Sequence, residues 1–355
     1  MTTTTKSIPK TMVALKKASD APGLDLTAET PVPEMGPDDV LIRIVKAGIC
    51  GTDRHIYEWD AWSRRRIKIG TTIGHEFVGV IAAVGADVQT VQVGQRVSGE
   101  GHIGCNRCEA CRTGMAHVCD NVRIIGIDRD GTFAGYMSLP ERNVWPIHAS
   151  IPDNYAAIMD PLGNAVHTVM AANVSGRTVL VSGVGIIGLM AVPVARAAGA
   201  SRVIAVDVNA ARLDLARRLG ADECLSAREE DWPERVKKLT DGRGVHVVLE
   251  MSGAQPAIRG SLEAMRNGGT MAVLGLPSGD VSLDLARHLI FKGATFLGIN
   301  GRRMFETWYQ MESLLLSGRV NLDPIITHVI PLKDYRRGFE LMQAGEAIKV
   351  ILEIG

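Results

Sequence analysis

The sequence predicts an α/β protein with two domains, in which a mostly-β part is followed by a doubly wound parallel sheet. Three observations carry this prediction. The chain has 355 residues, more than one hydrophobic core usually supports. Short β-like runs broken by Gly and Pro fill its first part. From about residue 162, strand-like and helix-like segments alternate, which is typical of βαβ units and a parallel sheet.

The expected elements follow from apolar periodicity and from Gly and Pro breaks. Strands of the first part are expected near 40–45, 78–84 and 96–98. The parallel sheet is expected to use strands at 178–183, 203–208, 223–227, 245–251, 270–275 and 295–299, with helices at 186–198, 209–219, 232–240 and 256–266. After residue 300 we expect a helix at about 303–317, a strand at 328–332, a helix at 334–344 and a strand at 349–354. The Thr-rich start, residues 1–6, is expected to be a short frayed tail.

Composition favours a soluble globular protein without nucleic acid or membrane partners. The hydrophobic fraction is 46%, and 39 basic residues balance 39 acidic ones, so the formal net charge is zero. That balance gives no electrostatic reason to bind nucleic acid or an anionic membrane. No apolar run is long enough for a transmembrane helix, and the N-terminus lacks the apolar region of a secretory signal. The expected compartment is therefore the cytoplasm.

A glycine motif opens the first helix of the parallel sheet. Gly183-x-Gly185-x-x-Gly188 follows an apolar strand, and Asp207 ends the next strand nineteen residues beyond Gly188. This context is typical of a dinucleotide site. Gly183 would permit the tight turn, Gly185 would let the backbone approach the pyrophosphate, and Gly188 would allow close helix–strand packing. The helix N-terminus would then present N–H groups to the phosphates.

Asp207 would accept hydrogen bonds from the adenosine ribose and repel a 2′-phosphate, so NAD is expected rather than NADP. Ile187, inside the motif, is a further expected cofactor contact. Arg212, five residues beyond Asp207, is expected near the adenine, with a solvated helix position as an equal alternative.

Four of the six cysteines lie within fifteen residues, which is too crowded for a disulfide framework in a chain of this size. Their spacing is Cys105-x2-Cys108-x2-Cys111-x7-Cys119. Four thiolates from one loop suit tetrahedral Zn²⁺ with no open position, and hence a structural role. The rival is an iron–sulfur cluster, but ferredoxin runs have three residues, not seven, before the last cysteine.

A second, more dispersed group could hold a metal with an open position. Cys50 lies in one loop, and His75 and Glu76 lie in another. One thiolate, one imidazole and a carboxylate would leave room on zinc for substrate or water, which is typical of a catalytic metal. From spacing alone, Cys50 as a small buried hydrophobe and His75 as a core histidine are equally acceptable.

The segment Gly74-His75-Glu76-x2-Gly79-x5-Gly85-x2-Val88 resembles the zinc signature of the medium-chain alcohol dehydrogenase superfamily. The four-cysteine lobe and the later glycine motif fit that superfamily in order and spacing. Within it, the closest resemblance is to the L-threonine 3-dehydrogenases. The segments that carry this resemblance are Cys50–Ser63, Ser98–His102, Asp160–Thr168, Leu249–Gly253, Phe305–Tyr309 and Pro324–His328.

The resemblance implies a GroES-like, mostly-β catalytic domain formed by residues 1–161 and 300–355, with the structural zinc lobe at about 100–122. It implies a Rossmann NAD-binding domain over residues 162–299. It also implies two Zn²⁺ per subunit, one catalytic and one structural, and a homotetramer.

The same resemblance assigns roles to the residues of the dispersed group. Cys50, His75 and Glu76 would be catalytic-zinc ligands, with Asp160 as fourth ligand or near-ligand. Asp53 would accept a hydrogen bond from a ligand imidazole and orient it.

Three further residues would serve the reaction. Thr52 and His55 would relay a proton from the substrate hydroxyl to solvent. His102 would recognise substrate, or else pack as an ordinary histidine beside the cysteine lobe.

The implied reaction is the NAD-dependent oxidation of the secondary alcohol of L-threonine, a small amino-acid alcohol, to L-2-amino-3-oxobutanoate in threonine catabolism. Zinc would act as Lewis acid, and hydride would pass to C4 of the nicotinamide. A polyol or 2,3-butanediol dehydrogenase is the nearest alternative. A non-catalytic NAD-binding sensor is a more distant one.

Overall fold

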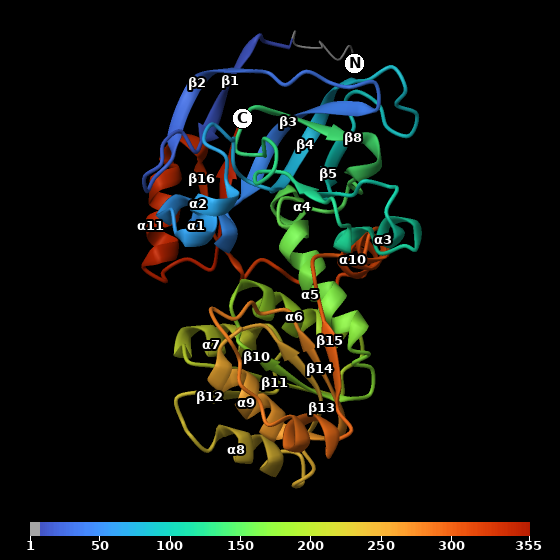
Figure 1. The fold of residues 1–355 in the computed structure, drawn as a ribbon, viewed down its shortest axis with the longest axis vertical. Helices are drawn as coiled ribbons and strands as arrows, with labels where there is room; N and C mark the ends of the chain where they lie inside the picture. Colours follow the sequence, from blue (N-terminus) through green and yellow to red (C-terminus); the bar gives the residue numbers. More distant parts are fainter. Residues whose placement is uncertain (1–7) are drawn as a thin grey trace. The chain divides into compact units, whose positions relative to one another are not determined.

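A computed structural model of the chain describes residues 8–355, and these form two compact units (Figure 1). The first unit combines the described residues up to Asp160 with Ile326–Gly355, and the second unit is Pro161–Ile325. The expected tail at residues 1–6 lies outside the described residues.

A seven-stranded sheet forms the centre of the first unit. Its strand order is β16-β17-β3-β4-β5-β9, and β8 also pairs with β3. The strands are β3 (Asp39–Gly48), β4 (Glu76–Val84), β5 (Arg96–Gly99), β8 (Tyr136–Pro140), β9 (Val144–Pro146), β16 (Ile326–Pro331) and β17 (Lys349–Glu353). Ile42, Phe77 and Phe339 are among the side chains that are almost fully buried in its core.

Smaller elements surround this sheet. Two further pairs are β1 (Thr11–Lys16) with β2 (Asp25–Pro31), and β6 (His102–Ile103) with β7 (Arg123–Ile124). The helices are α1 (Gly51–Glu58), α2 (Ala61–Arg66), α3 (Glu109–Arg112), α4 (Asp153–Ala156) and α11 (Tyr335–Gln343). The sequence predicted the strands β3, β4 and β5 but neither α1 nor α2.

Two ring contacts hold α1 in place. Tyr57 of α1 stacks on Phe339 of α11, with ring centroids 4.4 Å apart. The buried ammonium group of Lys17 lies 4.1 Å from the ring centroid of Trp59, the C-cap residue at the same end of the helix. Because aromatic stacking and cation–π contacts constrain orientation as well as distance, they fix the C-terminal end of α1 in the first unit.

The second unit is a six-stranded parallel sheet with the order β12-β11-β10-β13-β14-β15. Its strands are β10 (Thr178–Ser182), β11 (Arg202–Asp207), β12 (Glu223–Ser226), β13 (Val245–Glu250), β14 (Met265–Val273) and β15 (Thr295–Gly298). In order of appearance along the chain this arrangement is 3-2-1-4-5-6, the doubly wound order of dinucleotide-binding domains. The six predicted strands and the fold class are confirmed, although β14 begins earlier than predicted.

Helices cover this sheet in two groups. α6 (Ile186–Ala197) packs against α7 (Ala210–Arg218), and α8 (Trp232–Lys238) packs against α9 (Gln255–Ala264). Gly199 and Gly220, just beyond α6 and α7, have φ values of +91° and +106°, which L side chains rarely adopt. The strand order reverses between β10 and β13, so the carboxyl ends of these two strands mark the switch point at which ligands bind in such sheets.

The second unit extends further along the chain than the sequence indicated, because residues 300–325 belong to it rather than to the first unit. The reason is packing. Trp308 and Met311 of α10 (Glu306–Leu316) are fully buried. The buried side chain of Arg302 lies over Gly163, near the start of the unit on α5 (Met159–Ala171), where an added Cβ would come within 2.4 Å of Arg302 Cδ.

Within residues 8–355, none of the helices has the length and apolar composition needed to span a membrane.

Candidate metal centres and nucleotide site

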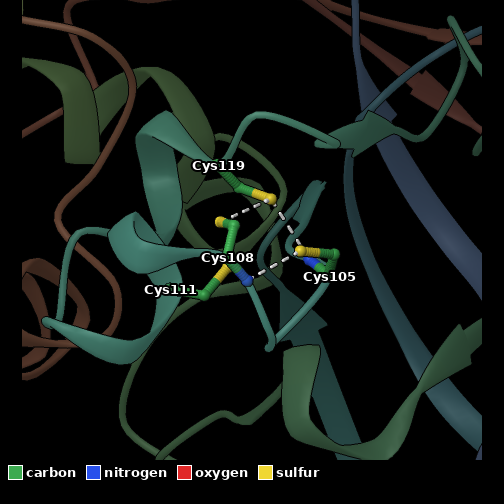
Figure 2. A group of neighbouring side chains, drawn as sticks. All are labelled: Cys105, Cys108, Cys111 and Cys119. Atoms are coloured by element: carbon green, nitrogen blue, oxygen red, sulfur yellow. Dashed lines mark hydrogen bonds between the residues drawn. The ribbon is translucent and has the colours of Figure 1, made fainter.

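Four cysteine sulfurs converge in the loop that follows β6. The Sγ atoms of Cys105, Cys108, Cys111 and Cys119 all lie within 4.8 Å of one another (Figure 2). Cys108 and Cys119 Sγ are 3.7 Å apart, too far for a disulfide. Tetrahedral zinc with Zn–S bonds of about 2.3 Å separates its sulfurs by roughly 3.8 Å. The geometry therefore fits a four-thiolate zinc site.

Backbone N–H groups add to the case for thiolates in this loop. The N–H groups of Arg107 and Cys108 donate to the sulfur of Cys105 and lower its pKa to about 6. Burial, together with the neighbouring Cys119, raises the pKa of Cys111 to about 12. Four sulfurs this close cannot all ionise unless a cation compensates them, and a divalent metal ion supplies that charge.

The dispersed group predicted from the sequence also comes together. One ligand atom from each of Cys50, His75 and Glu76 lies within 4.8 Å of the others. The fold explains this meeting. β3 ends at Gly48, just before Cys50, and the antiparallel neighbour β4 begins at Glu76, which pairs with Gly48. The last residues of one strand and the first of the next therefore lie at the same edge of the sheet.

Asp53 orients the residues of this group. Its Oδ2 accepts the backbone N–H of Cys50 at 2.9 Å, forming a capping box at the start of α1. Its Oδ1 lies 3.6 Å from His75 Nδ1. The imidazole can thus turn Nδ1 toward a carboxylate and offer Nε2 to a metal, the usual arrangement of a ligand histidine.

Buried polar atoms in this group lack hydrogen-bond partners. Asp53 Oδ1 and His75 Nδ1 are buried and make no hydrogen bond in the structure, whereas the buried Glu76 Oε2 is in ion-pair contact with Lys349 Nζ at 2.6 Å. Burial opposes protonation of His75, but the charges of Asp53 and Cys50 outweigh it and raise the pKa of the imidazole well above its usual value. The group is therefore electron-rich and under-coordinated, which fits a divalent cation.

Asp160 lies near this group but outside it. Among the described residues its carboxylate is not part of the set within 4.8 Å. Its charge nevertheless contributes to raising the pKa of His75 and of Glu76, although burial is the largest cause at Glu76. The predicted role of Asp160 as fourth ligand stays a prediction.

Sequence reasoning missed two residues of this site. Lys349, fully buried on β17, has its Nζ 2.7 Å from Glu76 Oε1. A Cβ on Gly48 would lie 2.1 Å from Glu76 Oε2, so only glycine leaves room there. The available signal was Lys349 itself, a charged residue in an apolar run from 347 to 352, which demands a buried partner.

Thr52 and His55 lie on α1, one turn apart. Thr52 Oγ1 is 3.9 Å from Cys50 Sγ, so its hydroxyl borders the metal group. The His55 side chain is 60% exposed, and its Nδ1 is 2.8 Å from Asp60 Oδ2. The histidine thus has both a fixed orientation and access to solvent.

His102 begins β6, a few residues before the four cysteines. Its Nδ1 lies 2.9 Å from Oε1 of the buried Glu100, and its backbone N–H donates to the same oxygen at 2.9 Å. These contacts fix the ring and are compatible with both predicted roles, substrate recognition or packing beside the cysteine lobe.

The glycine motif of the second unit has the geometry that each glycine requires. Gly183 has a φ of +87°. An added Cβ on Gly188 would lie 2.1 Å from the carbonyl oxygen of Gly183, and one on Gly183 would lie 2.6 Å from Ser252 Cβ. An added Cβ on Gly185, the N-cap of α6, would meet no atom within 4 Å. The turn is therefore tight on its inner side and open where a phosphate would approach.

Asp207 is held at the carboxyl end of β11 beside this turn. Its Oδ2 accepts the N–H of Val184, and its Oδ1 accepts that of Asn209, both at 2.8 Å. A carboxylate fixed in this way is ready to accept ribose hydroxyls. Ile187 and Arg212 are half-buried on α6 and α7. Their predicted cofactor contacts stay predictions.

We expect Cys111→Ser to lower the metal content by one zinc ion per chain, because one of the four thiolates is lost. The melting temperature should fall by roughly 5–10 °C, since metal binding contributes directly to folding. Elemental analysis and calorimetry measure both quantities. Cys224→Ser, on β12 and outside both groups, is the matched control and should change neither. Equal zinc content in the two variants would contradict a metal at the four cysteines.

Family models match both units. Residues 36–149 match the model described as "Alcohol dehydrogenase GroES-like domain", and residues 187–317 match "Zinc-binding dehydrogenase". The chain is 47% identical to a protein named L-threonine 3-dehydrogenase from Symbiobacterium thermophilum, over 97% of this chain and 98% of that protein. It is 48% identical to a protein of the same name from Bacillus subtilis, over 96% of this chain and 98% of that protein.

Solved structures agree with this assignment. An alcohol dehydrogenase from Thermus sp. ATN1 matches with a TM-score of 0.90 and 31% identity, over 97% of this chain and all of that one. A zinc-binding dehydrogenase from Sinorhizobium meliloti 1021, bound to NADP, matches with a TM-score of 0.87 and 28% identity, over 98% of this chain and 100% of that one. The chain therefore belongs to the zinc-dependent medium-chain alcohol dehydrogenase superfamily.

Proposed function

We propose that this chain is a zinc-dependent, NAD-linked dehydrogenase that oxidises the secondary alcohol of L-threonine to L-2-amino-3-oxobutanoate. The observation that carries the proposal is the convergence of Cys50, His75 and Glu76 at one edge of the sheet. The choice of L-threonine as substrate is supported by the relatives named L-threonine 3-dehydrogenase, which match over nearly their whole length.

Cys50, His75 and Glu76 would hold the catalytic zinc, with Asp160 as a fourth ligand or near-ligand. When bound, zinc supplies a Lewis acid that lowers the pKa of the substrate hydroxyl. Asp53 keeps the His75 ring oriented through Nδ1. The four cysteines of Figure 2 would hold a second, structural zinc, which gives two ions per subunit.

The reaction also requires a route for the hydroxyl proton to solvent and an acceptor for the hydride. Thr52, next to Cys50, would accept the hydroxyl proton, and the exposed His55 would release it to solvent by way of the ribose of the cofactor. Hydride would pass to C4 of the nicotinamide. His102, held by Glu100, would contact the substrate.

NAD rather than NADP is proposed as the oxidant. The carboxylate of Asp207 is fixed by two backbone N–H groups at the end of β11, where it would repel a 2′-phosphate. The Gly183–Gly188 turn would hold the pyrophosphate, and Ile187 and Arg212 would complete the contacts.

The substrate is tested by comparing alcohols under identical conditions. We expect L-threonine with NAD to give the highest kcat/KM for NADH formation, above sorbitol and 2,3-butanediol. L-Threonine with NADP should be turned over at least about tenfold less efficiently, a difference of roughly 1.4 kcal/mol. A preference for sorbitol or 2,3-butanediol would replace the proposal by the polyol or diol alternative. No turnover of any alcohol by the zinc-loaded protein would favour a non-catalytic NAD sensor.

We expect His55→Ala to lower kcat at pH 7 by about 10²-fold, because the relay loses the group that exchanges protons with solvent. Initial rates of NADH formation from pH 6 to pH 9 measure this, and the loss should shrink at high pH, where hydroxide can take the proton. The control is His148→Ala, another exposed histidine, which should keep the full rate. An unchanged rate for His55→Ala at pH 7 would remove His55 from the relay.

We further propose that the chain assembles as a homotetramer. β15 is the last strand of the six-stranded sheet, with only β14 beside it among the described residues. Large apolar side chains lie exposed on and before it, namely Leu285, Ile290, Phe291 and Phe296. Such an edge favours pairing with another sheet. Light scattering should give the mass of four chains, and a monomer would contradict the proposal.

A further inference from the structure

Glu76 and Lys349 form a completely buried ion pair in the first unit. Both side chains have zero exposure. Lys349 Nζ lies 2.7 Å from Oε1 and 2.6 Å from Oε2 of Glu76, and it donates a third contact to the carbonyl oxygen of Ile49 at 2.8 Å. The ammonium group of Lys349 thus contacts both Glu76, a predicted metal ligand, and Ile49, the residue directly before Cys50, which is a second predicted ligand.

The two residues reach each other across a neighbouring strand. β17 and β4 lie on opposite sides of β3, and Gly48 of β3 pairs with Ile351 on one side and Glu76 on the other. An added Cβ on Gly48 would lie 3.1 Å from Lys349 Cε as well as 2.1 Å from Glu76 Oε2. The absence of a side chain at Gly48 is therefore what lets the lysine pass over β3 to the carboxylate.

Folding stability alone does not account for such a pair. Desolvation of two buried charges costs several kcal/mol per ion, and apolar residues of similar volume often stabilise a core equally well or better. The pair is instead placed at the metal group, where the ammonium group of Lys349 contacts both carboxylate oxygens of Glu76, Oε1 at 2.7 Å and Oε2 at 2.6 Å. A carboxylate that is already shared with an ammonium group is a weaker ligand for a metal cation than a free one.

We propose that Lys349 is a positioning residue of the catalytic metal site, which keeps Glu76 as a weak, exchangeable ligand so that a coordination position stays available for the alcohol. This inference rests on the proposed function, because it assumes a metal ion at Cys50, His75 and Glu76. It assigns a task in the reaction to the C-terminal strand, which lies 273 residues from Glu76 along the chain.

The test replaces Lys349 by methionine, which has similar length but no charge, in the full-length protein. With the ammonium group gone, Glu76 should bind the metal fully. We expect zinc to bind this site on the order of tenfold more tightly in a chelator competition, because a competing cation is removed. The visible absorption bands of the Co²⁺-substituted protein should shift in the absence of substrate, and kcat/KM should fall by about 10- to 100-fold.

Three further variants separate positioning from simple structural damage. K349R keeps the charge and should retain the wild-type cobalt spectrum. E76Q/K349M removes both charges, so its Co²⁺ bands should not show the shift of K349M. K46M is the matched control, because Lys46 also pairs with a glutamate, Glu353, between β3 and β17, but at an exposed position and 3.2 Å away. K46M should behave as wild type in every measurement.

The outcomes distinguish failure of this inference from failure of the proposed function. If wild-type protein binds metal at both sites but K349M keeps its zinc affinity and cobalt spectrum, then Lys349 is structural only and the inference is overturned. If K349M does not fold, K349R carries the test, and a folded K349R whose cobalt spectrum differs from that of wild type would overturn the inference. If wild-type protein binds zinc only at the four cysteines, the proposed function itself fails.

Discussion

The edge of the sheet at Gly48 is the constraint on which the first unit depends. Three strands have an end there: β3 finishes, β4 starts and β17 starts. Each end brings one charged or metal-binding group, namely Cys50 just after β3, Glu76 on β4 and Lys349 on β17. Because antiparallel neighbours place a last residue beside a first one, groups far apart in sequence meet without any long loop.

Helix α1 places the metal ligand and the proposed proton-relay groups at this edge in a fixed order. Its capping box sets Cys50 and Asp53 at the N-terminus, and Thr52 and His55 lie on the first turns of the same helix. The stacked rings of Tyr57 and Phe339 hold the helix against α11, from the other end of the chain. A rigid helix that carries both a metal ligand and the relay groups fixes their spacing, which proton transfer requires.

Much of the fold was readable from the sequence, because apolar periodicity and glycine breaks are local signals. The strands of the second unit follow from such runs, and the clustering of Cys105 to Cys119 needs no tertiary information. Contacts across long separations were not readable. Nothing local pairs Lys349 with Glu76, and the placement of residues 300–325 depends on the burial of Trp308 and Arg302 in the second unit. Asp53, Cys50 and His75 were found through family resemblance rather than spacing.

The four-cysteine loop has a consequence for how the protein responds to its surroundings. All four sulfurs come from fifteen consecutive residues, so closing the loop around an ion carries a small entropic cost and needs few other contacts. An ion bound only by the ordered loop shifts the folding equilibrium by RT ln(1 + [L]/Kd). The abundance of intact protein is then coupled to the free zinc concentration, so a mineral nutrient would act on the lifetime of the chain as well as on its catalysis.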